Sequence, residues 1–156
     1  MKSKPLPYIF LIGFWVFILA ACSSGPEQPK IDPTQGAQML AGTYTTTISS
    51  DDVSKFSISK DPALASNQGD WQFILTSDGK FTAEMGGEFM VGGIYTVTGD
   101  QIEVYIKDSC EDCGCQESIG RYNWRLSGDA LSFFKTAGSC YGMDLVLTSH
   151  ALTRVP

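Results

Sequence analysis

The sequence predicts an all-β fold, a small antiparallel meander β-barrel of about seven or eight strands that follows a signal peptide and a tether. Three observations predict it. Residues 71–85, 93–106 and 120–135 each alternate apolar and polar side chains, as strands with one buried face do. An adjacent Asp and Gly interrupt each segment, which indicates a tight hairpin turn. A meander of such hairpins leaves exposed edges unless it closes, and closure produces a barrel.

The first 21 residues have the pattern of a secretory signal peptide. Lys2 and Lys4 precede the apolar run IFLIGFWVFIL, and small residues lead up to Cys22. A basic start, a short apolar stretch and small residues at a cleavage point define such signals. The run is short for a stable membrane span, which takes about 20 apolar residues. The alternative is an uncleaved N-terminal anchor helix.

The stretch Leu19-Ala20-Ala21-Cys22 resembles the lipobox of bacterial lipoproteins. The resemblance implies cleavage before Cys22, a diacylglyceryl group on its sulfur and acylation of the new amino group. Two or more acyl chains hold a protein stably on a membrane. Ser23 rather than Asp follows the cysteine, and by the same resemblance this favours the outer membrane. The expected location is therefore the cell envelope, lipid-anchored to the outer membrane and facing the periplasm.

The rest of the chain divides into a tether and one acidic domain. Residues 22–40 are rich in Pro, Gly, Gln and Ser, as flexible or extended tethers are, and residues 41–156 suffice for one domain with its own core. Removing Lys2 and Lys4 lowers the basic residues from 11 to 9 against 17 acidic ones, so the formal charge moves from −6 to −8. An acidic domain repels phosphate groups, which argues against nucleic-acid binding and polybasic docking on membranes.

Each hairpin is expected to turn at a specific pair of residues. The pairs are Asp78-Gly79, Gly99-Asp100 and Gly128-Asp129. Residues 42–48 and 151–155 are candidates for the strands that close the sheet. The segment 143–150, MDLVLTSH, leaves a short helix and a further strand both open.

Short motifs at both ends of the predicted domain carry a family resemblance. They are Gly42-x-Tyr44, the Gly120-x-Tyr122-x-Trp124 hairpin with its Gly128-Asp129-x-Leu131 turn, and the stretch LTSHALTR at 147–154. Together they resemble the lipocalin-like domains of small exported bacterial proteins, within the calycin group, over about residues 41–155. In calycins a first-strand Gly-x-Trp packs against an arginine of the closing strand. The resemblance implies that Tyr44 takes the place of that Trp and that Arg154 is its partner.

The cysteines beyond Cys22 are expected to form disulfides, because the envelope is oxidising. If the third hairpin turns at Gly128-Asp129, residues whose numbers sum to about 257 face each other, so Cys140 falls opposite residue 117. Cys115 lies next to that position, within reach of a disulfide. We therefore expect Cys115 to pair with Cys140 and Cys110 with Cys113. Metal binding by the C-x2-C-x-C cluster and thiol–disulfide exchange remain alternatives.

The predicted function is non-covalent binding of a small hydrophobic ligand inside the barrel, with no enzymatic activity, cofactor or metal. The single histidine, His150, has no nucleophile motif to serve. The alternatives are a protein-binding envelope module acting through rim loops at 49–68 and 109–118, and metal or redox sensing through the cysteines. Alternation places the following aromatic and aliphatic residues on the inward face as ligand-binding candidates: Trp71, Phe73, Phe81, Tyr95, Val104, Tyr122, Trp124 and Phe133.

Overall fold

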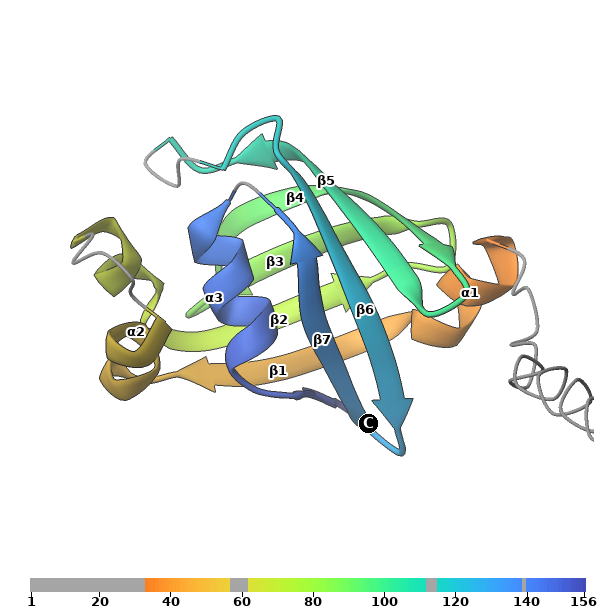
Figure 1. The fold of residues 1–156 in the computed structure, drawn as a ribbon, viewed down its shortest axis with the longest axis horizontal. Coiled ribbons are helices and arrows are strands. Elements are labelled where there is room, and N and C mark those ends of the chain that lie inside the picture. The colour runs from red at the N-terminus through yellow and green to blue at the C-terminus, as the bar shows by residue number, and fades with distance from the viewer. Residues whose placement is uncertain (1–32, 57–61, 112–114, 139) are drawn as a thin grey trace, which may run out of the picture.

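A single sheet that closes on itself positions every other part of the domain. The structure is a computed structural model and describes residues 33–56, 62–111, 115–138 and 140–156. Within them, eight antiparallel strands follow one another in chain order and the last pairs with the first (Figure 1). The all-β meander barrel is thus confirmed, and it is compatible with a lipocalin-like fold. The strands are β1 (Gly42–Ile48), β2 (Gly69–Leu75), β3 (Lys80–Met85), β4 (Glu88–Thr98), β5 (Gln101–Ser109), β6 (Ile119–Ser127), β7 (Ala130–Ala137) and β8 (Leu152–Arg154).

The three predicted hairpins and their turns are all present. β2 pairs with β3, β4 with β5 and β6 with β7. The turn glycines Gly79, Gly99 and Gly128 have φ angles of 80°, 62° and 59°. Side chains with a Cβ rarely adopt such positive φ angles, so glycine lets these turns form without strain.

Alternating side chains of the strands meet inside the barrel. Three inward side chains are at most 2% exposed: Phe73, Ile102 and Tyr122. Their sequence neighbours point outward, and of these Gln72 and Glu103 are partly exposed and Arg121 is exposed. Burying each large apolar side chain contributes about 1.5–3 kcal/mol, so this inward face is the main source of stability.

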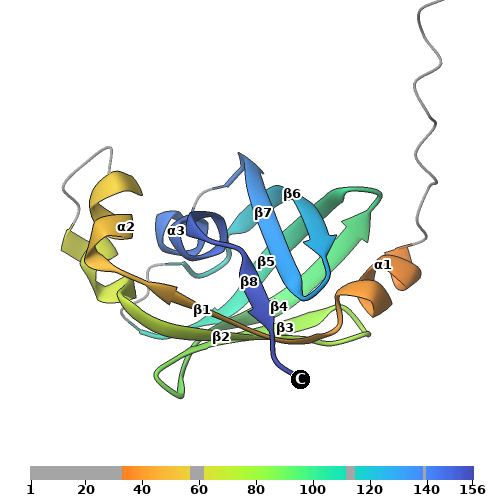
Figure 2. The ribbon, with the colours of Figure 1, turned by 90° about the horizontal axis from the view of Figure 1, so that it is seen from below.

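One helix differs from the expected tether. Residues 33–40 form α1 (Pro33–Leu40), which lies across one end of the barrel (Figure 2), so the irregular segment expected up to residue 40 is helical over its last eight residues. Ala37 and Leu40 are buried against the barrel. A Cβ at Gly36 would lie 2.5 Å from Val97 Cγ1, so glycine permits this close approach. The apolar pair Ala37 and Leu40, three residues apart, is the reason this piece of chain docks.

Two short helices and the loop after β5 lie toward the opposite end of the barrel (Figure 1). They are α2 (Ser50–Phe56) and the 3₁₀ helix η1 (Pro62–Asn67), both in the connection between β1 and β2. None of the helices in the described residues is long and apolar enough to cross a bilayer.

The last helix, α3 (Tyr141–Ser149), decides between the two possibilities for residues 143–150 in favour of a helix. It packs against β7, η1, α2 and β1. β8 is only three residues long and pairs with Tyr44 and Thr45 of β1 and with Ala130 and Leu131 of β7. β8 ends after these pairs. α3, which precedes it in the chain, contacts both β7 and β1 and so covers the space between them that a longer β8 would fill.

Candidate functional site

At the α1 end, Arg154 joins the closing strand to the first strand. Its guanidinium carbon lies 5.1 Å from the centre of the Tyr44 ring, and its Nε and Nη2 donate to the Tyr44 hydroxyl at 3.1 and 2.5 Å. Nη2 also donates to the carbonyl oxygens of Met39 and Ala41 at 3.1 and 3.2 Å. The pairing of Tyr44 with Arg154 implied by the family resemblance is therefore present, and it ties α1, β1 and β8 together.

The centre of the barrel holds a small apolar cavity. Its volume is about 20 Å³, which is about the space of one water molecule. Eight of the side chains around it come from the barrel wall and two from α3. The lining residues are Phe73, Leu75, Phe81, Tyr95, Ile102, Val104, Phe133, Met143, Leu147 and Leu152. Five of the eight predicted ligand-binding residues, Phe73, Phe81, Tyr95, Val104 and Phe133, are among them.

Tyr95 contributes its ring to this cavity and directs its hydroxyl elsewhere. The hydroxyl lies 2.7 Å from the carbonyl oxygen of Thr76 and 3.2 Å from that of Ala37. Burial raises the pKa of Tyr95 to about 12, so the group stays a neutral donor. The cavity wall is consequently apolar even where it includes a phenol.

The other three predicted ligand-binding residues lie elsewhere. Trp71 donates its indole Nε1 to the carbonyl of Asn67 at 2.9 Å, and its buried ring stacks on that of Phe73 at 6.1 Å between centroids. Tyr122 belongs to a buried polar cluster beside α3. Trp124 is partly buried, and its Nε1 has no hydrogen-bond partner among the described residues. Five of the predicted residues thus line the cavity and three do not, because inward direction alone does not decide which layer of a barrel a side chain occupies.

The polar cluster centres on Asp144 of α3, the one charged residue in the described chain that is fully buried. Its carboxylate accepts a hydrogen bond from the Tyr122 hydroxyl at 2.7 Å and one from Lys135 Nζ at 2.5 Å. Burial first, and the adjacent carboxylate second, raise the pKa of Tyr122. The Lys135 side chain is 34% exposed, so its ammonium group connects the buried carboxylate to solvent.

A disulfide fixes the beginning of α3. Cys140 is bonded to Cys115 with a Cα–Cα distance of 5.2 Å, which confirms the predicted pair. Cys140 is also the N-cap residue, and its sulfur accepts from the Met143 amide at 3.4 Å. Cys110 is disulfide-bonded as well. Its predicted partner Cys113 lies outside the described residues, so that pairing stays a prediction, as does the lipidation of Cys22.

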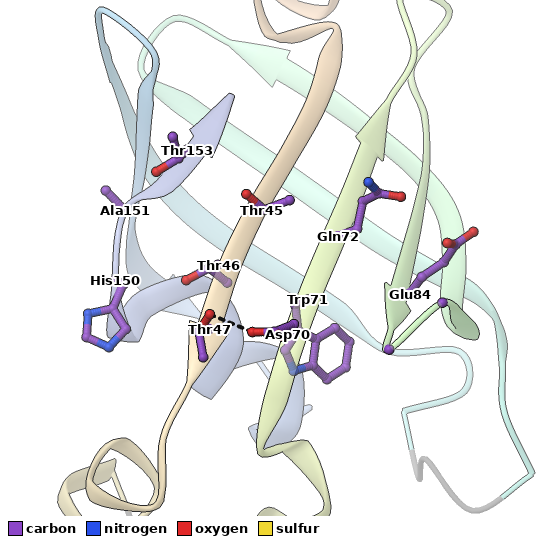
Figure 3. Close-up of a pocket in the computed structure, with 12 residues that line it drawn as sticks. Thr45, Thr46, Thr47, Asp70, Trp71, Gln72, Glu84, His150, Ala151 and Thr153 are labelled. Carbon is purple, nitrogen blue, oxygen red and sulfur yellow. Dashed lines mark hydrogen bonds between the residues drawn. The ribbon is translucent and has the colours of Figure 1, made fainter. Parts of the chain in front are cut away.

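A wide polar groove of about 720 Å³ runs over the outer face of β8, β1, β2 and β3 (Figure 3). Thr153, Thr45, Gln72 and Glu84 form a row across it, because each is the cross-strand partner of the next. The Thr47 hydroxyl donates to Asp70 at 2.7 Å beside this row. Asp70 and Glu84 contribute two carboxylates to the lining. Our sequence reasoning missed it, although the run of three threonines at 45–47 in one strand is a visible signal.

His150 lies at one edge of this groove and ends α3. Its Nε2 is 3.0 Å from Oδ1 of Asp52 in α2. Hydrogen bonds from the hydroxyl and amide of Ser49 are the main reason that the pKa of Asp52 is lowered, and the imidazole adds to the effect. The arrangement joins the end of α3 to α2. Among the described residues, no group of three or more His, Cys, Asp or Glu side chains is placed to hold a metal ion.

Comparison with known proteins does not add an identity. No protein-family model matches the chain, and no curated protein matches it in sequence. The geometry of this barrel and the sequence patterns described above are therefore the basis for its function.

Proposed function

We propose that this chain is a lipid-anchored protein of the bacterial envelope whose barrel binds a small apolar molecule without covalent chemistry. The observation that supports it is the apolar lining of the central cavity, where the phenol of Tyr95 turns its hydroxyl to backbone carbonyls. Apolar walls with few polar groups are typical of sites for small apolar ligands. The anchor at Cys22 and the location at the outer membrane rest on the sequence from Leu19 to Ser23.

The size of the cavity sets a condition on this function. Ligand sites usually have about 300–1,000 Å³, whereas this cavity has about 20 Å³. A ligand therefore binds only when side chains that now fill the interior move aside. Since most of the lining belongs to strands held in a closed sheet, the two residues from α3 are the ones best placed to move.

The direct test is ligand-dependent thermal stability of the delipidated mature domain. Fatty acids of increasing chain length are added, and an acyl chain that binds the folded state at a hundred times its Kd stabilises it by about 2.7 kcal/mol, which raises Tm. Val104→Phe, which fills the interior, should reduce the shift, while Ile94→Phe on the exposed outer face should leave it unchanged. A folded wild-type domain whose Tm responds to no fatty acid would exclude the proposal.

A second candidate is a protein-binding module that acts through the rim. The specific observation is that α2, η1 and the loop after β5, which contain most of the predicted rim segments 49–68 and 109–118, lie toward the same end of the barrel (Figure 1). A pull-down from envelope extract with exposed α2 residues changed, for example Asp51→Lys and Lys55→Glu, separates the two candidates. Partner binding should then be lost while fatty-acid binding survives. Two intact disulfides by mass measurement, with no bound metal, would exclude the metal and redox alternative.

A further inference from the structure

The helix that completes the cavity is held by a charged contact in an otherwise apolar setting. We propose that α3 is a displaceable plug: the side chains of Met143 and Leu147 occupy the place of one slender aliphatic chain of the ligand, and Asp144 with Lys135 and Tyr122 is the latch that holds the plug. This inference rests on the proposed function, since it locates the ligand and names what controls its access.

The residues that fill the site are spaced to replace a chain. Met143 and Leu147 are four residues apart and therefore lie one above the other on the same face of α3. Both are at most 5% exposed, and both line the cavity together with eight residues of the barrel. An unbranched thioether stacked on an isobutyl group forms a narrow column. Its removal leaves space for an aliphatic chain rather than for a broad, rigid polycycle.

Both ends of α3 are tied down, so its displacement is a rotation or a small outward shift. The Cys115–Cys140 disulfide ties the beginning of the helix to the loop after β5. At the other end, the His150–Asp52 contact and β8 connect it to α2 and to the sheet. Between those ties, the Asp144 contacts with Tyr122 and Lys135 are the polar interactions that join the middle of α3 to the barrel wall in the described residues.

A charged latch opens at lower cost than an apolar one. When α3 turns outward, the Asp144 carboxylate and the Lys135 ammonium group regain hydration, which offsets part of the Coulomb attraction that they lose. Lys135 is already 34% exposed, so water reaches this pair first. An apolar side chain at position 144 would become exposed in the displaced state without gaining any favourable hydration in return. The closed and displaced states are thus closer in free energy than they would be with an apolar helix face.

The test uses the full mature domain with both disulfides intact and the linear fluorescent fatty acid cis-parinaric acid as the probe. Tyr122→Phe removes one hydrogen bond of the latch and keeps the ring, and Asp144→Asn removes the charge. If either raises the displaced population tenfold, the apparent Kd falls about tenfold, because affinity scales with the fraction of binding-competent molecules. Met143→Trp enlarges the plug and should abolish binding. Palmitate should compete with the probe, and cholesterol should not.

Asp78→Asn is the matched control, because Asp78 forms an exposed pair with Lys80 Nζ at 2.6 Å, at the turn between β2 and β3. It should leave the apparent Kd unchanged. Equal affinity in the wild type, Tyr122→Phe and Asp144→Asn would overturn the latch and leave the proposed function standing. Binding that survives Met143→Trp would place the probe elsewhere, for instance in the outer groove, and overturn the plug. No binding by any folded variant, with folding checked by Tm, would overturn the proposed function itself.

Discussion

At the α1 end of the barrel an arginine meets a phenol and two backbone carbonyls, whereas at the α3 end a lysine meets a buried carboxylate. Arg154 contacts the hydroxyl of Tyr44 and the backbone carbonyls of Met39 and Ala41. The α3 end depends on Asp144 and on a disulfide. Each of the two contacts combines a cation with a tyrosine, but the hydrogen bonds of Arg154 in the described residues go to a phenol and to backbone carbonyls, whereas Lys135 binds a carboxylate. The difference indicates that the α1 end is a permanent closure and the α3 end a conditional one.

The largest expected effect is loss of the disulfide at the α3 end. Replacing Cys115 and Cys140 together by serine removes a cross-link that closes a separation of 25 residues, and should lower the free energy of unfolding by about 3 kcal/mol. Chemical denaturation of the double variant and the wild type measures it. Hydrogen exchange should show that amides of α3 lose more protection than those of α1. An equal loss at both ends would contradict the comparison.

Removing the carboxylate comes next. Asp144→Ala leaves the Lys135 ammonium group and the Tyr122 hydroxyl without their partner, and should destabilise the domain by about 2–3 kcal/mol, less than for a wholly buried pair because Lys135 reaches solvent. Urea denaturation measures the change. The exposed pair provides the contrast, since water already screens it and Asp78→Ala should therefore lower the stability less than Asp144→Ala does.

At the α1 end, Arg154→Lys keeps the positive charge but loses the several N–H donors of the planar guanidinium group. A lysine cannot reach the Tyr44 hydroxyl and the carbonyls of Met39 and Ala41 at once, so the expected loss is about 1–2 kcal/mol. Thermal unfolding measures it. Fatty-acid affinity should remain at the wild-type level, and a large gain in affinity would show that this end also controls access.

The smallest expected effect is a difference in acid response. The pKa of Asp52 is lowered in the folded state, so the stability that its contacts contribute is complete above pH 3.8, its ordinary pKa, and is lost progressively as the pH falls toward the folded value. Hydrogen exchange followed down from pH 5 should show α2 and the end of α3 loosening before α1. The same series on Asp52→Asn should lose this difference between the two ends.

The sequence predicted the sheet better than the helices that cover it. Alternation and the turn glycines specify a strand and its register locally, so the hairpins at Gly79, Gly99 and Gly128 and the Cys115–Cys140 pair followed from the residues. α1 was missed because its helix depends on contacts with Val97, some 60 residues away, rather than on its own propensity.

The sequence predicted that the barrel interior is apolar, but it did not predict that side chains of α3 help to fill that interior. The aromatic stripe correctly indicated an apolar interior at Phe73, Phe81 and Phe133. That Met143 and Leu147 fill the remaining space follows from how α3 docks, which depends on the short β8. One signal was visible in advance: a single aspartate in the apolar run MDLVL indicates a buried polar partner elsewhere in the fold.

The position of α1 has a consequence for the proposed lipid anchor. A chain anchored at Cys22 has only residues 23–32 between the lipid and this helix, a span of at most about 35 Å. For such an anchored chain, we propose that the side of the barrel held by Arg154 faces the bilayer and that the α3 side, with Asp144, faces the aqueous compartment. Under this proposal, a ligand released there would pass to another soluble carrier or receptor instead of returning directly to the membrane.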